Sequence, residues 1–357
     1  MGENNERNTM TDTRSYTSRK NPGSAKRDAA IDALLAEHAP SEHQDLLSQM
    51  MITVCRLAKD NAGRGEIKIL NTALKELRYA FKVFAPYSHI PKVTIFGSSR
   101  TPEDHPEYVQ ARKFAERMEK EGWMVITGAG DGIMRAGHHG AKREASFGVA
   151  ISLPFEQETN DIISDDPKCI NFKYFFTRKL LFVKEAAAVV LFPGGLGTQD
   201  ENFETLTLIQ TSKADLVPVV LCDAPGGTYW TQWREYVEEQ LLKKDMISPD
   251  DMNLFKITDD IDVAVREVLH FYKRYHSSRM VRDDLVMRLK SPLSPQAVER
   301  LNDEFGDLAT GGRIHTLSTP MTAEGDEFPD LQRLVIKYNY RNIGRLRLMI
   351  DAINDEE

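Results

Sequence analysis

The stretch AAAVVLFPGGLGTQDENFETLTLIQ, residues 186–210, decides the fold class of this chain. Its first seven residues form an uninterrupted apolar run, which is typical of a strand buried on both faces of a parallel sheet. Three glycines and Thr198 then form a turn, and Asp200 and Glu201 stand where the next helix should open. A buried strand, a glycine-rich turn and a helix in this order indicate an α/β protein with parallel strands.

Similar units lie on both sides of this stretch. Short apolar segments predict strands at 93–96, 123–127, 148–153, 188–192 and 218–221. The segments between and after them predict helices at about 105–121, 132–144, 172–186, 199–212 and 230–243. This alternation predicts a Rossmann-like, doubly wound parallel sheet with right-handed crossovers, in which ligands bind at the carboxyl ends of the strands.

Other regions flank the α/β region, which we assign to residues 89–275. Residues 1–27 are polar, carry charges of both signs and lack the apolar centre of a signal peptide, so we expect a disordered tail. Residues 28–88 have apolar side chains at helical spacing and predict a helical region. Beyond about residue 275 the segments become shorter, and 276–357 predict a small α+β appendage.

The composition argues against several classes of protein. The 357 residues are 41% hydrophobic and 28% charged, and no apolar run is long enough for a membrane span, so we expect a soluble protein without a membrane partner. A net charge of −8 with both signs interspersed disfavours nucleic-acid binding. The widely separated Cys55, Cys169 and Cys222 predict neither a disulfide framework nor a zinc site, and they fit a cytoplasmic location.

Three loops that follow predicted strands are rich in glycine or small polar residues. They are GSSR at 97–100, TGAGDGIM at 127–134 and PGGLGTQDE at 193–201. Since the carboxyl ends of parallel strands lie along one edge of a sheet, the loops should converge on one crevice. A glycine-rich turn that leads into a helix exposes backbone N–H groups, which bind phosphate well.

The three loop sequences differ in how specifically they indicate a ligand site. The GAGDG sequence at 128–132 is explained equally well by a plain tight turn. In the third loop, Asp200 is explained by the favourable position of an acidic residue at a helix start. Glu201 lies about 100° further round the helix, on the same face as Glu204. One of the two acidic residues therefore faces the ligand, and a basic partner should accompany it.

Arg178 is the candidate for that basic partner. The helix expected at 172–186 is apolar on most sides, so the pair formed by Arg178 and Lys179 requires an explanation. A solvent-facing pair is the simplest one. Because this helix leads directly into the strand before PGGLGT, Arg178 can also reach the crevice and pair with Glu201 or with a phosphate. The functional interpretation is weaker for Lys179.

Some motifs support no specific chemistry. His138 and His139 lie on the helix after GAGDG without a carboxylate or thiol at ligand spacing, so we expect them at the helix surface or an interface and predict no metal site. The chain has neither a GxSxG nucleophile turn nor a GxxxxGK[ST] phosphate loop. Hydrolases and nucleoside triphosphatases built on those motifs are therefore disfavoured.

The chain resembles the Lonely Guy (LOG) family, phosphoribohydrolases that were long labelled lysine decarboxylases. The resemblance covers about residues 90–275. It rests on GSS at 97–99, GAGDGIMRAGHHGA at 128–141, LPFEQ at 153–157, FFTRK at 175–179 and PGGLGTQDENFETLTLIQ at 193–210. The family pairs an Arg in an R-K dipeptide with a Glu in PGGxGTxxE, and these positions fall on Arg178 and Glu201. The terminal additions resemble those of larger bacterial members.

The resemblance implies an activity. Members hydrolyse the N-glycosidic bond of a nucleoside 5′-monophosphate, such as AMP or a cytokinin riboside 5′-monophosphate, to free base and ribose 5-phosphate. Neither a metal nor a redox cofactor is implied, and a homodimer or higher homo-oligomer is expected. Arg178 and Glu201 would be catalytic. The residues expected to bind the nucleotide are Gly97, Ser98, Ser99, Gly130, Asp131, Gly132, Lys179, Gly194, Gly195, Gly197 and Thr198.

Two other functions remain open. The same resemblance extends to molybdenum-cofactor carrier proteins, which bind without hydrolysing, so a non-catalytic nucleotide or cofactor carrier is the main alternative. The presence of both Arg178 and Glu201 favours the enzyme. Amino-acid decarboxylation, as in the older family label, is disfavoured because no lysine stands in a recognisable pyridoxal-phosphate context.

Overall fold

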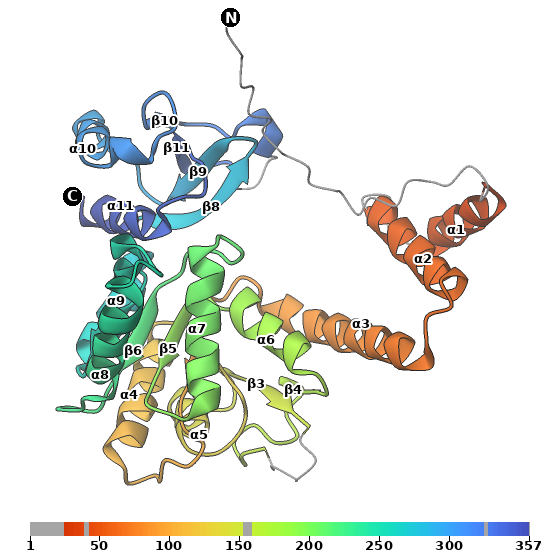
Figure 1. Ribbon diagram of the computed structural model, residues 1–357, viewed down its shortest axis with the longest axis horizontal. Helices are drawn as coiled ribbons and strands as arrows, with labels where there is room; N and C mark the ends of the chain where they lie inside the picture. Colours follow the sequence, from red (N-terminus) through yellow and green to blue (C-terminus); the bar gives the residue numbers. More distant parts are fainter. Residues whose placement is uncertain (1–24, 39–42, 153–158, 325–327, 357) are drawn as a thin grey trace, which may run out of the picture. The chain divides into compact units, whose positions relative to one another are not determined.

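The computed structural model describes residues 25–38, 43–152, 159–324 and 328–356 (Figure 1). Most of the tail expected at 1–27 and the LPFEQ segment lie outside the described residues. The chain divides into two compact units, one that extends to Leu74 and one that begins at Lys75. No helix in the described ranges combines the length and the apolar character that a membrane span requires.

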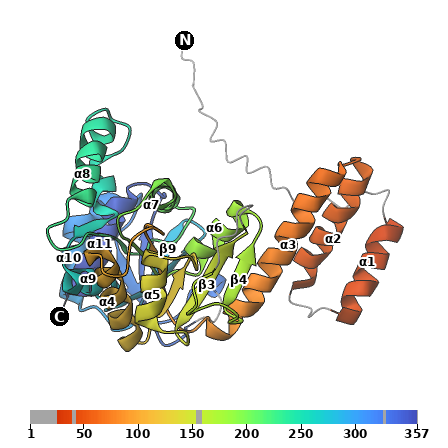
Figure 2. The same ribbon diagram turned by 90° about the horizontal axis from the view of Figure 1, so that it is seen from below.

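The first unit is helical, as the sequence predicts (Figure 2). It contains α1 (Ala25–His38), α2 (Gln44–Lys59) and the first half of α3 (Arg64–Phe84). Its small core is formed by Ile31 and Leu35 of α1 with Ile52 of α2. The helix α1 begins at Ala25, slightly before the position expected from the sequence.

The second unit is built on a seven-stranded parallel sheet with the strand order β4-β3-β2-β1-β5-β6-β7. This confirms the Rossmann-like α/β fold. The strands are β1 (Lys92–Phe96), β2 (Met124–Thr127), β3 (Ser146–Ile151), β4 (Cys169–Phe172), β5 (Ala188–Leu191), β6 (Val219–Cys222) and β7 (Lys256–Thr258). The helices of this region are α4 (Pro106–Lys120), α5 (Ile133–Ala141), α6 (Phe175–Lys184), α7 (Leu196–Gln210), α8 (Tyr229–Tyr236) and α9 (Ile261–Phe271).

The sheet is buried on both faces, which explains the unalternating apolar run of β5. Val190 packs into one cluster with Phe114 of α4. Its neighbour Leu191 packs into another cluster with Phe182 of α6 and Ile209 of α7. Because successive side chains of a strand point to opposite faces, a strand covered by helices on both sides must be apolar throughout.

Some elements differ from those expected. The strand β4 and the β7–α9 unit were not predicted from the sequence, and Phe172, expected in a helix, ends β4. The helix α6 therefore begins at Phe175. The helix α7 begins at Leu196 rather than near residue 199, so Gly197 and Thr198 belong to its first turn. The glycine-rich turn is therefore shorter than expected, and the helix starts closer to the crevice than the sequence predicts.

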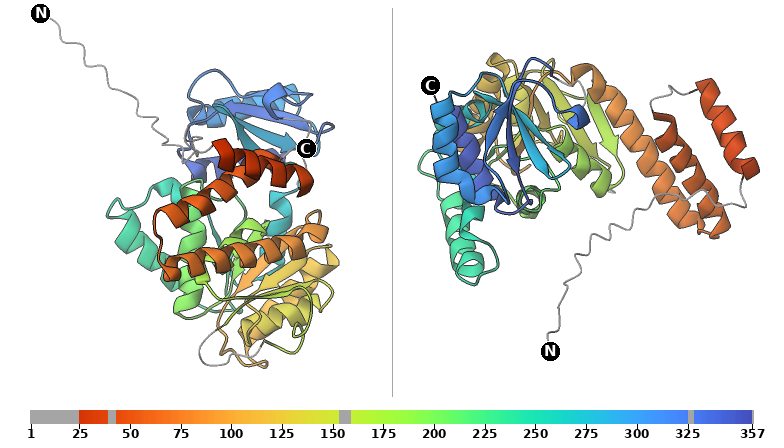
Figure 3. Two further views of the ribbon diagram at one scale, coloured as in Figure 1. Left: turned by 90° about the vertical axis from the view of Figure 1, so that its right-hand side faces the viewer. Right: turned by 90° about the horizontal axis from the view of Figure 1, so that it is seen from above.

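The C-terminal region is a small α+β structure, as predicted (blue in Figure 3). Its antiparallel sheet has the order β10-β11-β9-β8. The elements are β8 (Tyr275–Val281), β9 (Asp284–Leu289), α10 (Pro295–Phe305), β10 (His315–Leu317), β11 (Gln332–Lys337) and α11 (Ile343–Asp355). Met287 and Leu334 on one face of the sheet belong to the same apolar cluster as Leu301 of α10 and Met349 of α11.

Short helical turns connect these elements. They are the 3-10 turns Ala85–Tyr87, Pro249–Asn253, Gly306–Leu308 and Thr322–Glu324, and the π-helical turn Val237–Leu242 that continues α8. The turn at Thr322–Glu324 lies over the second face of the C-terminal sheet, where Glu324 forms buried ion pairs with Arg288 and Arg333.

Candidate active site

The three loops named from the sequence meet at the carboxyl ends of the central strands. The N–H of Ser98 in the first loop donates to the carbonyl of Pro193 in the third, at 3.0 Å. The carbonyl of Ser98 accepts from the N–H of Ile133 in the second loop, at 3.0 Å. The first loop therefore holds the other two together.

Two glycines permit this close packing. A Cβ atom on Gly194 would lie 2.9 Å from the backbone nitrogen of Ser98. Gly132, which caps α5, has a φ of 61°, and a Cβ there would lie 2.7 Å from the carbonyl carbon of Ser99. A side chain at either position would push the loops apart, so close loop packing requires glycine at both positions.

A pocket of about 680 Å³ lies between the three loops and α6. Of the residues expected at the site, those that line it are Gly97, Ser98, Ser99, Gly130, Arg178, Gly195, Gly197, Thr198 and Glu201. Those that do not line it are Asp131, Gly132, Lys179 and Gly194. Its other lining residues are Phe96, Arg100, Gly128, Ala129, Met134, Ala150, Ile151, Thr159, Phe175, Leu196 and Asp200.

The start of α7 forms one wall of the pocket. The cap residue Gly195 offers no side-chain hydrogen bond to the helix. The N–H groups of the first turn have no acceptor within their own helix, and they carry the positive end of the helix dipole. No atom lies within 4 Å of the position of a Cβ on Gly195 or Gly197, so this backbone is open to a ligand. Such a helix start is suited to a phosphate group.

Arg178 lines the pocket from α6 and is largely buried. Its Nε donates to the carbonyl of Val149 at 2.9 Å, and its guanidinium lies 5.0 Å from the centre of the Phe182 ring. A Cβ atom on Gly128 would lie 2.5 Å from Nη2 of Arg178, so the loop glycine makes room for the guanidinium. Burial lowers the pKa of Arg178, and the nearby Glu201 opposes this effect.

Glu201 lines the pocket from α7 and is buried, with 9% of its surface exposed. Burial raises the pKa of its carboxyl from the ordinary 4.5 to about 7, although the positive charge of Lys179 lowers it. The carboxyl therefore titrates near neutral pH, as a group that exchanges protons during a reaction must do.

Of the two partners expected for Arg178, Glu201 or a phosphate, Glu201 forms no ion pair with it among the described residues. Lys179 is the cation that pairs with the acidic residues of α7: its Nζ lies 2.8 Å from Asp200, 3.8 Å from Glu201 and in direct contact with Glu204. The sequence contained a signal for a cation beside α7, because three carboxylates within five residues of one helix require a nearby positive charge.

His138 is not at a surface, contrary to the expectation from the sequence. Its side chain is fully buried within α5, and burial lowers its pKa from 6.5 to about 4. Nε2 lies 3.0 Å from the hydroxyl of Thr127 and 3.1 Å from the carbonyl of Phe147. The ring is buried because α5 packs between the sheet and α4. Of the two neighbouring histidines, His139 is the exposed one.

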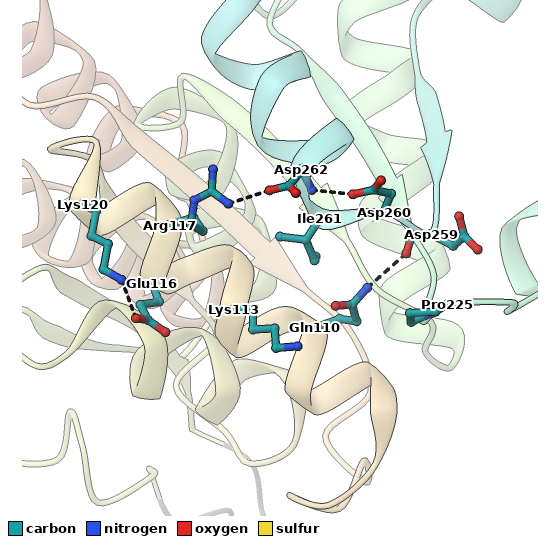
Figure 4. Close-up of a pocket in the computed structure, with 10 residues that line it drawn as sticks. All are labelled: Gln110, Lys113, Glu116, Arg117, Lys120, Pro225, Asp259, Asp260, Ile261 and Asp262. Atoms are coloured by element: carbon teal, nitrogen blue, oxygen red, sulfur yellow. Dashed lines mark hydrogen bonds and ion pairs between the residues drawn. The ribbon is translucent and has the colours of Figure 1, made fainter.

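A second surface pocket, of about 570 Å³, lies between α4 and the start of α9 (Figure 4). Four of its charged side chains form two ion pairs: Arg117 lies 2.5 Å from Asp262, and Lys120 lies 2.6 Å from Glu116. These pairs partly neutralise the charges that line this pocket. No cluster of side chains suited to a metal ion occurs within the described ranges.

Residues 128–268 match a family model described as "Possible lysine decarboxylase". The match covers less than half of the chain, but it includes the loops at 128–132 and 193–201 and the FFTRK segment, and it supports the resemblance to the LOG family. No curated protein matches the chain significantly.

Several solved structures resemble half of the chain. The molybdenum cofactor carrier protein of Chlamydomonas reinhardtii is 20% identical, with a TM-score of 0.35 over 50% of this chain and 98% of the carrier. The molybdenum cofactor binding protein of Rippkaea orientalis is 18% identical, with a TM-score of 0.34 over 50% and 94%. DNA processing protein A of Helicobacter pylori is 15% identical, with a TM-score of 0.35 over 50% and 80%. Similarity at this level carries no argument about function.

Proposed function

We propose that the protein hydrolyses the N-glycosidic bond of a nucleoside 5′-monophosphate, AMP or a cytokinin riboside 5′-monophosphate, to free base and ribose 5-phosphate. The observation that carries the proposal is one pocket that combines a buried carboxyl with a pKa of about 7, a partly buried guanidinium and an open helix start. These groups match the parts that such a reaction requires: a general base that accepts a proton, a cation and a phosphate site.

The phosphate binds at the start of α7. Gly197 and Thr198 of the first turn of this helix line the pocket, and the adjacent loop at 97–99 contributes two serines to the lining. Since the helix start carries a partial positive charge, a dianionic phosphate is favoured over an uncharged ribose hydroxyl. Substrates that lack the 5′-phosphate should therefore react poorly.

Glu201 performs the proton chemistry. Cleavage of an N-glycosidic bond passes through a sugar with oxocarbenium character, which a nearby carboxylate stabilises. With a pKa of about 7, the same carboxylate accepts a proton from the attacking water. The guanidinium of Arg178 contacts the phosphate or the base, and its bond to Val149 fixes its direction.

The base occupies the apolar part of the pocket. Met134, Ile151 and Phe175 give it a wall without charge, and an aromatic ring is suited to stacking on a purine. Every base has an aromatic face, so this wall favours stacking without selecting one base.

The active form is a homodimer or a higher homo-oligomer. Phe175, Phe176 and Leu180 of α6 are 53%, 56% and 46% exposed, and Leu196 at the start of α7 is 91% exposed. Phe175 and Leu196 also line the pocket, so a second copy that covers this apolar surface would close the pocket rim. Light scattering of the wild type and of Phe176→Glu tests this: a monomeric wild type would contradict it.

The test of the proposed function is product release from a panel of nucleoside 5′-monophosphates. We expect free base and ribose 5-phosphate from the wild type and a loss of about a hundredfold or more in Glu201→Ala and Arg178→Ala. Glu235→Ala, which removes an exposed carboxylate from α8, is the matched control and should retain activity. Tight nucleotide binding with no base released by any of the four proteins would favour a non-catalytic carrier.

A further inference from the structure

Behind the loop at 128–132 lies a buried polar network that no part of the proposed mechanism uses. It joins His138 of α5 to Asn160, a residue that follows β3 at some distance in the chain. Both side chains are almost completely buried, at 0% and 4% exposure. A buried polar network of this kind is retained only when its members satisfy one another, so its geometry is well defined.

Asn160 donates hydrogen bonds to two consecutive carbonyls of the loop at 128–132. Its side-chain Nδ2 donates to the carbonyl of Ala129 at 3.1 Å and to the carbonyl of Gly130 at 2.9 Å. Its backbone N–H also donates to the carbonyl of Ala129, at 2.9 Å. Ala129 has a φ of 62°, a left-handed conformation that residues other than glycine rarely adopt. The three hydrogen bonds hold the loop in this conformation.

His138 holds Asn160 in the orientation that makes these bonds. The imidazole is neutral at pH 7 and has one N–H group. The carbonyl of Phe147, 3.1 Å from Nε2, can only accept, so Nε2 carries the hydrogen. Nδ1 is then an acceptor, 3.1 Å from Nδ2 of Asn160 and 3.3 Å from its Oδ1. The two N–H bonds of Nδ2 are shared between Nδ1 and the two loop carbonyls, and all three of these acceptors favour Nδ2 rather than Oδ1 at this position.

The orientation of the carbonyls determines where the N–H groups point. In a planar trans peptide, the C=O of one residue and the N–H of the next point in opposite directions. Since the carbonyls of Ala129 and Gly130 face Asn160, the N–H groups of Gly130 and Asp131 point away from it. Neither N–H donates to any of the described residues, and Gly130 lines the pocket.

We infer that Asn160, oriented by His138, is a positioning residue that presents the N–H group of Gly130 to the pocket as a second anchor for an acceptor atom of the bound nucleotide. The ligand class rests on the proposed function, but the inference does not require that the nucleotide be cleaved. The acceptor is an oxygen of the phosphate or ribose, or a ring nitrogen of the base, because each of these accepts from a backbone N–H.

The test is the affinity for AMP, measured by calorimetry in a Glu201→Gln background so that the ligand is not consumed. Asn160→Asp keeps the size of the side chain but replaces both N–H donors by an oxygen that faces the two loop carbonyls. We expect binding to weaken at least about tenfold, which is the loss of roughly one hydrogen bond. Asn171→Asp is the matched control, because it makes the same change on an exposed residue of β4 and should bind within about twofold of its parent.

Two further readouts separate positioning from a general loss of structure. In the hydrolysis assay, Asn160→Asp should raise KM about tenfold and change kcat by less than about threefold. A fall in kcat at unchanged KM would instead indicate fewer folded molecules and would overturn the inference, as would affinity within twofold of the parent. Hydrogen–deuterium exchange of the segment 128–132 should accelerate in Asn160→Asp and remain unchanged in Asn171→Asp.

A second pair of variants keeps the inference testable if Asn160→Asp does not fold. His138→Asn retains an acceptor near the Asn160 amide, whereas His138→Leu removes it. We expect the former to bind AMP at least about threefold more tightly than the latter; equal affinities would contradict the inference. A wild type that binds AMP but releases no base would refute the proposed function alone, and a wild type that binds no nucleoside 5′-monophosphate would overturn both.

Discussion

Replacement of Glu201 by glutamine should make the protein more stable while it abolishes activity. Glutamine resembles the protonated carboxyl in shape but cannot ionise. Burial raises the pKa of Glu201 from 4.5 to about 7, so the folded protein binds this proton more tightly than the unfolded chain. Between these two pH values the folded state carries more protons, and stability therefore falls as the pH rises through this window.

The size of the effect follows from that pKa difference. At about 1.4 kcal/mol per pKa unit, the ionised Glu201 costs the wild type about 3 kcal/mol at pH 8 and about 1 kcal/mol at pH 5. Glu201→Gln avoids this cost. For a chain of this size, about 2 °C accompanies each kcal/mol, so the melting temperature should rise by about 6 °C at pH 8 and about 2 °C at pH 5.

Calorimetric melting of the wild type and Glu201→Gln at both pH values provides the assay, together with base release from AMP. Activity should fall by about a hundredfold to ten-thousandfold, as expected for a group that moves protons. Glu235→Gln, an exposed residue of α8, should melt as the wild type does at both pH values. A variant that is no more stable than the wild type at pH 8, or equally stabilised at both pH values, would refute the argument.

Three other substitutions test the geometry of the pocket. Lys179→Ala removes a positive charge that lowers the pKa of Glu201, so the pKa of this carboxyl should rise. Because the activity increases as Glu201 ionises, the rising limb of the pH–rate profile should move to a higher pH. Gly128→Ala brings a Cβ within 2.5 Å of Nη2 of Arg178; kcat/KM should fall about ten- to a hundredfold while the melting temperature changes little, because a flexible side chain can move. Gly194→Ala brings a Cβ within 2.9 Å of backbone instead, so denaturant unfolding should show a loss of about 1–3 kcal/mol together with weaker AMP binding.

The sheet was the most predictable part of the fold. The strand β5 is apolar without alternation, β1 contains a short apolar run, and both strands lead into loops that contain glycine. These signals are local in the sequence. The strand β4 was missed because CINF, 169–172, is short and leads into the apolar residues of α6, whose pattern continues that of a helix. Its pairing with β3 is a tertiary contact, which no local pattern contains.

The site was predictable where its residues follow strands. Glu201 and Arg178 line one pocket, as the order of the loops indicated, since strand ends meet at one edge of a parallel sheet. The pairing within the site was not predictable from local sequence: Lys179 rather than Arg178 forms the ion pairs with α7. Asn160 was missed entirely, because it reaches the loop from thirty residues away and no spacing rule connects the two.

The most direct test of the central claim compares AMP with adenosine as substrates of the wild-type protein, with free adenine measured by chromatography. The start of α7 binds the phosphate that only AMP carries, so adenine should be released from AMP at least about a hundredfold faster than from adenosine, a difference of about 2.7 kcal/mol. Ribose 5-phosphate should appear in equal amount with the adenine. Equal rates from the two compounds, or no free base from AMP or any other nucleoside 5′-monophosphate, would contradict the account.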